Sequence, residues 1–184
     1  MKKEKENQKN YLINKTLEYL KDTSSDFLNL SIDIIFNPEK IVGGLIQFRG
    51  YNKSYIYKKV SNLKNSSYFS EKNSKVYLTE KGRIKIIKNI LKDKREDKNW
   101  DSKWWAIIFD IPELNRRERS FLRRELSLIG FKEIQKSVWI FPFDVEKELL
   151  ALIKLWKKDF TGDIRFLKIE KISDDKDIRK FFGL

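Results

Sequence analysis

Residues 92–103, KDKREDKNWDSK, divide the sequence into two halves with different patterns. This stretch contains almost no apolar side chain except Trp100. Because so polar a stretch contributes little to a hydrophobic core, it is typical of a boundary between domains. We predict an α+β protein with an N-terminal domain at 1–95, a linker at 96–103 and a C-terminal domain at 104–184.

The C-terminal half alternates strand and helix patterns. An apolar run at 104–109 predicts a buried strand, and apolar spacing over 116–129 predicts a helix that Gly130 ends. Further strands are predicted at 131–135, 137–141 and 164–172, and a second helix at 145–160. The resulting order, β-α-β-β-α-β, is that of the ferredoxin-like fold.

The N-terminal half begins with helical spacing. Loose helical periodicity is present over 11–20 and again over 27–35. Further along, Ile56, Val60 and Leu63 fall at i, i+4 and i+7, so they share one face of a helix. The opposite face of this helix is polar and cationic.

A hairpin pattern follows the polar-fronted helix, which we place at 54–65. Strands are predicted at 68–70 and 75–78, joined by a polar turn at 71–74, and another helix starts at 79–81. Helices, a polar-fronted helix, a hairpin and a further helix are the order of a winged helix-turn-helix.

The front of the 54–65 helix and the hairpin are the candidate DNA-binding surfaces. In a winged helix the polar-fronted helix enters the major groove, while the hairpin wing contacts the backbone or the minor groove. The candidates are Ser54, Lys58, Lys59, Ser61 and Asn62 on the helix and Lys72 and Lys75 on the wing. Lys-rich helix and hairpin patterns also occur in protein-binding domains, so an adaptor for an acidic partner is an alternative.

The basic charge of the chain is unevenly distributed. The formal net charge is +13; residues 1–95 carry 21 Lys and Arg against 10 Asp and Glu, and residues 96–184 carry 19 against 17. Residues 49–95 alone hold 14 basic and 3 acidic side chains. Double-stranded DNA is a natural partner for this surface because each phosphate contact releases counterions. The alternative is a basic surface that only favours solubility.

The chain has no cysteine and no histidine. Disulfides, thiolate zinc sites, Ser/His/Asp triads and Cys/His pairs are therefore excluded. Any catalysis would have to use carboxylates, Lys, Tyr or a metal held by oxygen. No apolar run approaches the roughly 20 residues that span a bilayer, and the N-terminus lacks a signal-peptide pattern, so we predict a cytoplasmic protein with no membrane partner.

Four motifs in the C-terminal half carry a family resemblance. They are W-D-x-K-W-W-x-I-x-F-D-I-P-E, the helix R-R-x-R-x-x-L-R-x-x-L, L-x-x-x-G-F, and Q-K-S-V-W-I-x-P, within 100–143. Together they resemble the central domain of the PaaX-like regulators, named for the phenylacetate-operon repressor, and more closely short CRISPR-associated versions of it. The domain is also similar to the small CRISPR adaptation nuclease, Cas-two. In the N-terminal half, T-E-K-G at 79–82 fits the regulators' winged helix.

The resemblance implies a winged helix fused to a ferredoxin-like dimerisation domain. Such a protein would be a sequence-specific double-stranded DNA-binding transcriptional regulator, a repressor, acting as a homodimer. The longer regulators have an extra C-terminal domain that this chain lacks, so an acyl-coenzyme A effector is not expected. The alternative is a metal-dependent nuclease or a DNA-holding subunit of a CRISPR spacer-acquisition complex.

Asp110, at the end of the first predicted strand of this domain, has two interpretations. In the nuclease relatives a strand-terminal Asp from each subunit is proposed to hold a divalent metal, which would make Asp110 a Mg²⁺ ligand and a catalytic residue of an endonuclease. The structural interpretation, which we favour, is that its carboxylate accepts backbone N–H bonds or pairs with Arg116, Arg117 or Arg119. On this interpretation the protein needs no cofactor.

The helix over 116–129 carries a basic stripe. Arg116, Arg119 and Arg123 lie at i, i+3 and i+7, so they share one side of the helix and can grip phosphate across a dimer. Arg116 and Arg119 are therefore further candidates for DNA contact. The alternative is a solvated face, because Glu118 and Glu125 dilute the charge.

Overall fold

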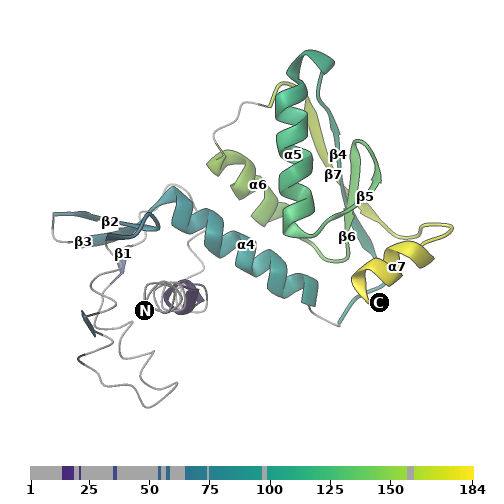
Figure 1. Ribbon diagram of the computed structural model, residues 1–184. Helices are drawn as coiled ribbons and strands as arrows, with labels where there is room; N and C mark the ends of the chain where they lie inside the picture. Colours follow the sequence, from purple (N-terminus) through teal and green to yellow (C-terminus); the bar gives the residue numbers. More distant parts are fainter. Residues whose placement is uncertain are drawn as a thin grey trace, which may run out of the picture. The chain divides into compact units, whose positions relative to one another are not determined.

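The chain divides into two compact units, and each is described by itself. The computed structural model (Figure 1) describes residues 14–18, 21, 35–36, 54, 57–58, 65–73, 75–96, 99–156 and 160–184. The first unit spans Met1–Asn89 and the second Ile90–Leu184. Among the described residues, no helix combines the length and the apolar composition that crossing a bilayer requires.

The first unit contains a three-stranded antiparallel sheet. Its strands are β1 (Ile35–Phe36), β2 (Phe69–Lys72) and β3 (Lys75–Leu78), in the order β1-β3-β2. Residues 14–18, 21, 54 and 57–58 are helical, and α4 (Glu80–Glu96) follows the hairpin. The hairpin and the helix after it are as predicted.

Two local predictions in this unit were wrong. The helix expected over 27–35 is wrong at Ile35, which pairs with Tyr77 as a strand, and 27–34 lie outside the described residues. A short apolar run fits the periodicity of a helix and that of a strand equally well. Here the edge of β3 offers backbone groups for pairing, which favours a strand. The predicted turn at 71–74 is shorter, because β2 continues to Lys72, and Asn73 takes a left-handed conformation with φ 51°.

The T-E-K-G motif joins the hairpin to α4. Thr79 donates its hydroxyl to the carbonyl of Ser67 at 2.8 Å and accepts the backbone N–H of Gly82 at 3.2 Å, so it caps the helix. Gly82 is buried against the hairpin, and a Cβ there would lie 2.5 Å from the carbonyl oxygen of Tyr68 and 2.5 Å from Leu78 Cδ1. The motif therefore positions the hairpin on the first turn of α4.

Replacing Gly82 by alanine is expected to destabilise the first unit. Alanine improves helix propensity by about 1 kcal/mol, but overpacking against a backbone oxygen costs roughly 1–3 kcal/mol because the hairpin must move. The measurement is the free energy of unfolding from denaturant titration, with the exposed neighbour Lys81→Ala as the control. A Gly82→Ala variant more stable than the wild type would contradict the close contact.

The second unit has the predicted βαββαβ order. Its elements are β4 (Trp104–Asp110), the 3₁₀ turn η3 (Glu113–Asn115), α5 (Arg116–Ile129), β5 (Lys132–Gln135), β6 (Val138–Phe141), α6 (Glu146–Leu155), β7 (Asp163–Ile169) and α7 (Lys176–Phe182). The sheet is antiparallel with the order β5-β6-β4-β7. The helix predicted over 145–160 is shorter than expected, since α6 ends at Leu155, and 157–159 lie outside the described residues.

Helices α5 and α6 cover one face of this sheet. On that face Ile107 lies beside Trp139, which in turn lies beside Glu133. Arg123 of α5 donates to Glu133 at 2.7 Å, which places α5 over this face, and α6 lies beside α5 (Figure 1). The opposite face carries the alternate residues of β4, and we call it the open face.

The C-terminal helix α7 covers one end of the open face. Trp104, Ile140 and Ile178 form a buried cluster there, and Trp104 is 1% exposed. Trp100, from the predicted linker, packs against this cluster, with its ring 4.5 Å from that of Trp104. The rest of the open face has no helix over it among the described residues (Figure 1).

The last turn of α4 belongs to the second unit. Lys94 Nζ lies 2.9 Å from Glu148 Oε1, and the Arg95 guanidinium lies over the ring of Phe181 at 5.1 Å. Arg95 also fills the space where a Cβ of Gly130 would lie, at the C-terminal end of α5. A cation is favourable at that end of a helix. The compact second unit therefore begins inside α4, at Ile90.

Asp175 ties α7 to β4, and this contact should depend on pH. Arg179 donates to the Asp175 carboxylate at 2.9 Å and the Trp104 indole donates to it at 3.2 Å. The Arg179 hydrogen bond holds the pKa of Asp175 below its ordinary value of 3.8, with a smaller contribution from Trp104. Because the pKa is lowered on folding, the contact stabilises above about pH 4 and its contribution is lost as the pH falls through the lowered pKa.

We expect the tryptophan fluorescence of the wild type to change below about pH 4, as α7 loosens while the pH falls through the lowered pKa of Asp175. In Asp175→Asn this component should be missing, because the amide does not titrate. Identical pH profiles of the two proteins would show that Asp175 does not control α7.

Candidate nucleic-acid interface

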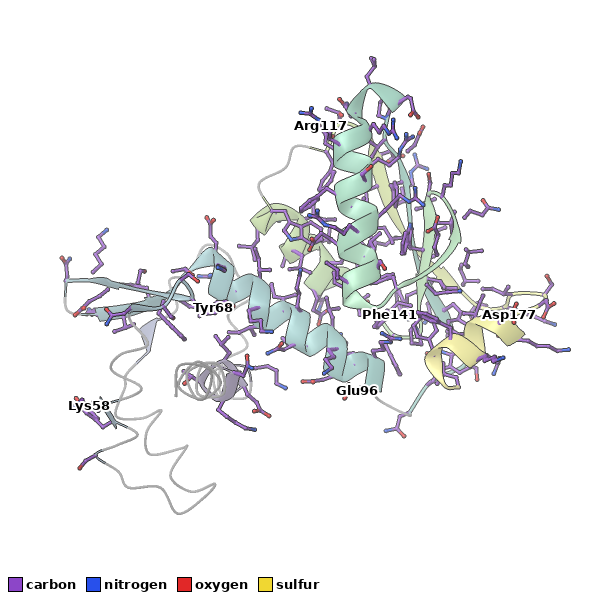
Figure 2. All side chains as sticks on the ribbon, in the orientation of Figure 1. Lys58, Tyr68, Glu96, Arg117, Phe141 and Asp177 are labelled. Atoms are coloured by element: carbon purple, nitrogen blue, oxygen red, sulfur yellow. The ribbon has the colours of Figure 1, made fainter. Side chains whose placement is uncertain are left out.

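The predicted recognition helix is only partly within the described residues. Ser54 and Lys58 are helical and exposed, and Figure 2 labels Lys58. Lys59, Ser61 and Asn62 lie outside the described residues. The exposed positions of Ser54 and Lys58 are compatible with contact to a macromolecule, and the face they share with the other three stays a prediction.

The two wing lysines lie directly opposite each other. Lys72 and Lys75 form the last ladder pair of the hairpin, and both side chains are exposed. The interior of the hairpin is held by Phe69, Val76 and Leu78, which are buried. Like charges directly opposite each other on two strands repel and destabilise the pair. The hairpin therefore ends in a concentrated positive charge.

The basic stripe of α5 is partly neutralised within the chain. Arg119 bonds Glu113 at 2.5 Å, and Arg123 bonds Glu133 at 2.7 Å. Arg116 is exposed, and the part of the chain that the structure describes offers it no ion pair. Of the stripe predicted from the sequence, Arg116 is thus the cation that stays available to a partner, whereas Arg119 would have to leave Glu113 first.

Two further cations, Arg117 and Lys136, join Arg116 at this end of the domain. We call this end, which consists of residues 113–117 and Lys136, the tip. Arg117 lies at the N-terminal end of α5 (Figure 2), and Lys136 lies in the turn between β5 and β6. Ser137 accepts the backbone N–H of Phe109 at 3.1 Å, which brings that turn to the end of β4. The sequence did not indicate Lys136, because only strand pairing places it beside the start of α5.

The charge at the tip is strong enough to change the ionisation of Glu113. The hydrogen bond from Arg119 lowers the pKa of the Glu113 carboxyl the most. The charges of Arg119, Arg116 and Lys136 lower it further. Three cations from two separate segments therefore act on one exposed carboxylate.

Asp110 ends β4 and is exposed. Its carbonyl oxygen lies against Gly162, where a Cβ would collide with it, so the Asp110 backbone shapes the turn. The predicted pairing with an arginine is not found: Arg119 pairs with Glu113, and no described residue forms an ion pair with Asp110. The structural role of Asp110 thus comes from its main chain.

Asp163 of β7 lies directly opposite Asp110, and the sequence analysis did not connect the two. Arg165 donates to Asp163 at 2.5 Å and keeps that carboxylate occupied. No group of three or more Asp or Glu residues that could hold a metal occurs within the described ranges. The predicted Mg²⁺ site would combine Asp110 with the same residue of a second copy, so the metal role of Asp110 stays a prediction.

Comparison with known proteins is informative for the second unit. Residues 97–177 match the family model of the PaaX protein central Cas2-like domain. No curated protein and no solved structure gives a significant match to the chain. The matched range contains β4 to β7, α5 and α6, and therefore the whole βαββαβ order. This part of the chain is therefore similar to the central Cas2-like domain of PaaX proteins.

Proposed function

We propose that the protein is a sequence-specific double-stranded DNA-binding transcriptional regulator, a repressor that acts as a homodimer. The observation that carries the proposal is the opposed pair Lys72 and Lys75 at the end of the hairpin. An exposed pair of like charges is unfavourable in the free protein and becomes favourable when phosphates lie beside it.

The order of elements around the wing supports the same function. The strand β1 precedes the helical residues 54 and 57–58, and it pairs with β3 rather than with β2. Helix, strand, helix, hairpin and helix in this order are compatible with a winged helix, in which the hairpin contacts DNA beside a recognition helix. The similarity of residues 97–177 to the central Cas2-like domain of PaaX proteins supports the same function.

The open face of the second unit is the surface that we assign to dimerisation. Ile108 and Val138 lie side by side on it, away from α5 and α6, and both are only half-buried. Leu167, on β7, lies on the same face and is 42% exposed. Apolar side chains on an uncovered sheet face gain free energy when a second copy covers them.

Replacing Leu167 by glutamate is expected to shift the dimer towards monomer. A charge on each copy of the interface would repel its counterpart and would be desolvated. Leu150→Glu on α6 is the matched control, because Leu150 is 41% exposed and belongs to the helix-covered side. Sedimentation should give a lower mass for Leu167→Glu alone; an unchanged mass would exclude this face.

Selection of bound duplexes from a random double-stranded pool tests the function. A regulator enriches one sequence, whereas a DNA-holding subunit retains DNA without enrichment and an adaptor for an acidic protein retains none. A metal-dependent endonuclease would cleave the pool in Mg²⁺, and Asp110→Asn would abolish that cleavage. Enrichment without cleavage is the result we expect.

A further inference from the structure

We propose that the tip of the second unit, made of Arg116, Arg117, Lys136 and Leu114, is a second DNA-contact surface that binds the phosphate backbone independently of sequence. This inference rests on the proposed function, because it assigns a further contact to the same duplex DNA. It concerns the central domain, whereas the recognition helix and the wing belong to the first unit.

The cations of the tip are held in place by the fold. Arg116 and Arg117 open α5, directly after η3, and Lys136 follows β5 in the adjacent turn. Glu118 accepts the backbone N–H and the hydroxyl of Thr161, each at 3.1 Å, which fixes the first turn of α5 to the segment before β7. Because the backbone that carries these cations is already ordered, binding costs only the ordering of their side chains.

The same cations are available to a partner. Arg116, Arg117 and Lys136 are exposed, and among the described residues no carboxylate pairs with any of them. The two nearest acidic side chains have other partners: Glu113 is paired with Arg119 at 2.5 Å, and Glu118 accepts hydrogen bonds from Thr161. Two guanidinium groups and an ammonium group therefore remain for an anion, and guanidinium groups bind phosphate oxygens in bidentate fashion.

Leu114 indicates a macromolecule rather than a free phosphate ion. Its side chain is 97% exposed, between the acidic and the basic residues of the tip. A small anion would use the cations and leave this side chain in water. Duplex DNA offers phosphates together with sugar and groove edges, against which apolar side chains pack beside Arg and Lys.

The choice of DNA over an acidic protein follows from the rest of the chain. The net charge is +13, and the wing presents a second cationic pair that is likewise exposed. A long polyanion such as duplex DNA can neutralise several separate cationic surfaces of one protein, whereas a small acidic protein would neutralise one of them.

The test compares two full-length triple variants with equal charge. The tip variant replaces Arg116, Arg117 and Lys136 by glutamine. The control variant replaces three exposed cations of α6 and α7 by glutamine: Lys147, Lys154 and Lys176. Circular dichroism and thermal unfolding establish that both variants fold. Affinity for a random-sequence duplex is then measured by fluorescence anisotropy over a series of salt concentrations.

The tip variant is expected to flatten the slope of log K against log salt by about 2–3. It should bind the duplex roughly 10- to 100-fold more weakly than the wild type at 0.1 M salt. The control variant should keep most of the wild-type slope. Equal slopes for the two variants would overturn the proposal. Equal competition by poly-glutamate and by duplex, at matched charge concentration, would also overturn it, because the tip would then not prefer DNA.

A third variant separates this inference from the proposed function. It removes the predicted DNA contacts of the first unit by replacing Lys58, Lys72 and Lys75 with glutamine. If only this variant loses salt dependence, the tip proposal fails and the DNA-binding function stands. If only the tip variant loses it, the tip binds DNA and the winged-helix assignment fails.

Discussion

Replacing Trp104 by alanine is expected to destabilise the second unit by about 3–5 kcal/mol, the range for removing a large aromatic side chain from a core. Trp104 is 1% exposed and is among the largest fully buried side chains among the described residues. Its ring lies 4.5 Å from that of Trp100 and 5.8 Å from that of Phe182. The substitution therefore removes the common contact of β4, α7 and the segment that precedes β4.

The loss should be larger than that from burial alone. The Trp104 indole donates to Asp175, which also binds Arg179, so its removal weakens the attachment of α7 to the sheet. The measurement is denaturant unfolding followed by circular dichroism, with Leu114→Ala as the control, because Leu114 is 97% exposed. The control should stay within about 0.5 kcal/mol of the wild type. A loss below about 1 kcal/mol for Trp104→Ala would contradict the packing of this cluster.

Replacing Lys58, Lys72 and Lys75 together by glutamine is expected to have the largest effect on DNA binding. Each lost phosphate contact removes about 0.9 from the slope of log K against log salt, so three contacts flatten the slope by roughly 2.7. Affinity for duplex DNA at 0.1 M salt should fall on the order of 100-fold.

The same variant should not lose stability, and this separates binding from folding. Lys72 and Lys75 repel each other across the ladder, so their neutralisation removes an unfavourable interaction. We expect the thermal midpoint to be equal to or higher than that of the wild type. The charge-matched substitutions of Lys147, Lys154 and Lys176 are the control for binding. A triple variant that binds duplex DNA with the wild-type slope would exclude the wing and Lys58 from the interface.

The second unit could be predicted from the sequence in most of its elements. The bounds of α5 coincide with the predicted helix, because its apolar spacing is regular and Gly130, with φ 106°, ends it in the left-handed conformation that glycine favours. The strand β1 could not be predicted, because two residues carry no periodicity and acquire their strand conformation from pairing with β3.

The candidate site was predictable only where it is local in sequence. The wing lysines follow from the hairpin pattern, and their direct opposition follows from a short turn. Asp163 and Lys136 could not be connected to Asp110 and Arg116, because antiparallel register and the β5–β6 turn bring them together over long sequence separations. The ionic partners of Arg119 and Arg123 could not be predicted either. Arginines at this spacing can form a stripe that binds phosphate or a set of internal ion pairs, and the sequence does not distinguish the two.

We propose that two copies of the chain, paired through the second unit, read two half-sites of duplex DNA. The most direct test is the affinity of the protein for its selected sequence, compared with the same half-sites separated by five additional base pairs. Five base pairs rotate one half-site by about half a helical turn, away from its reader. We predict at least a tenfold loss of affinity for the rotated site and a larger loss for a scrambled duplex. Equal affinity for the three duplexes would contradict the account.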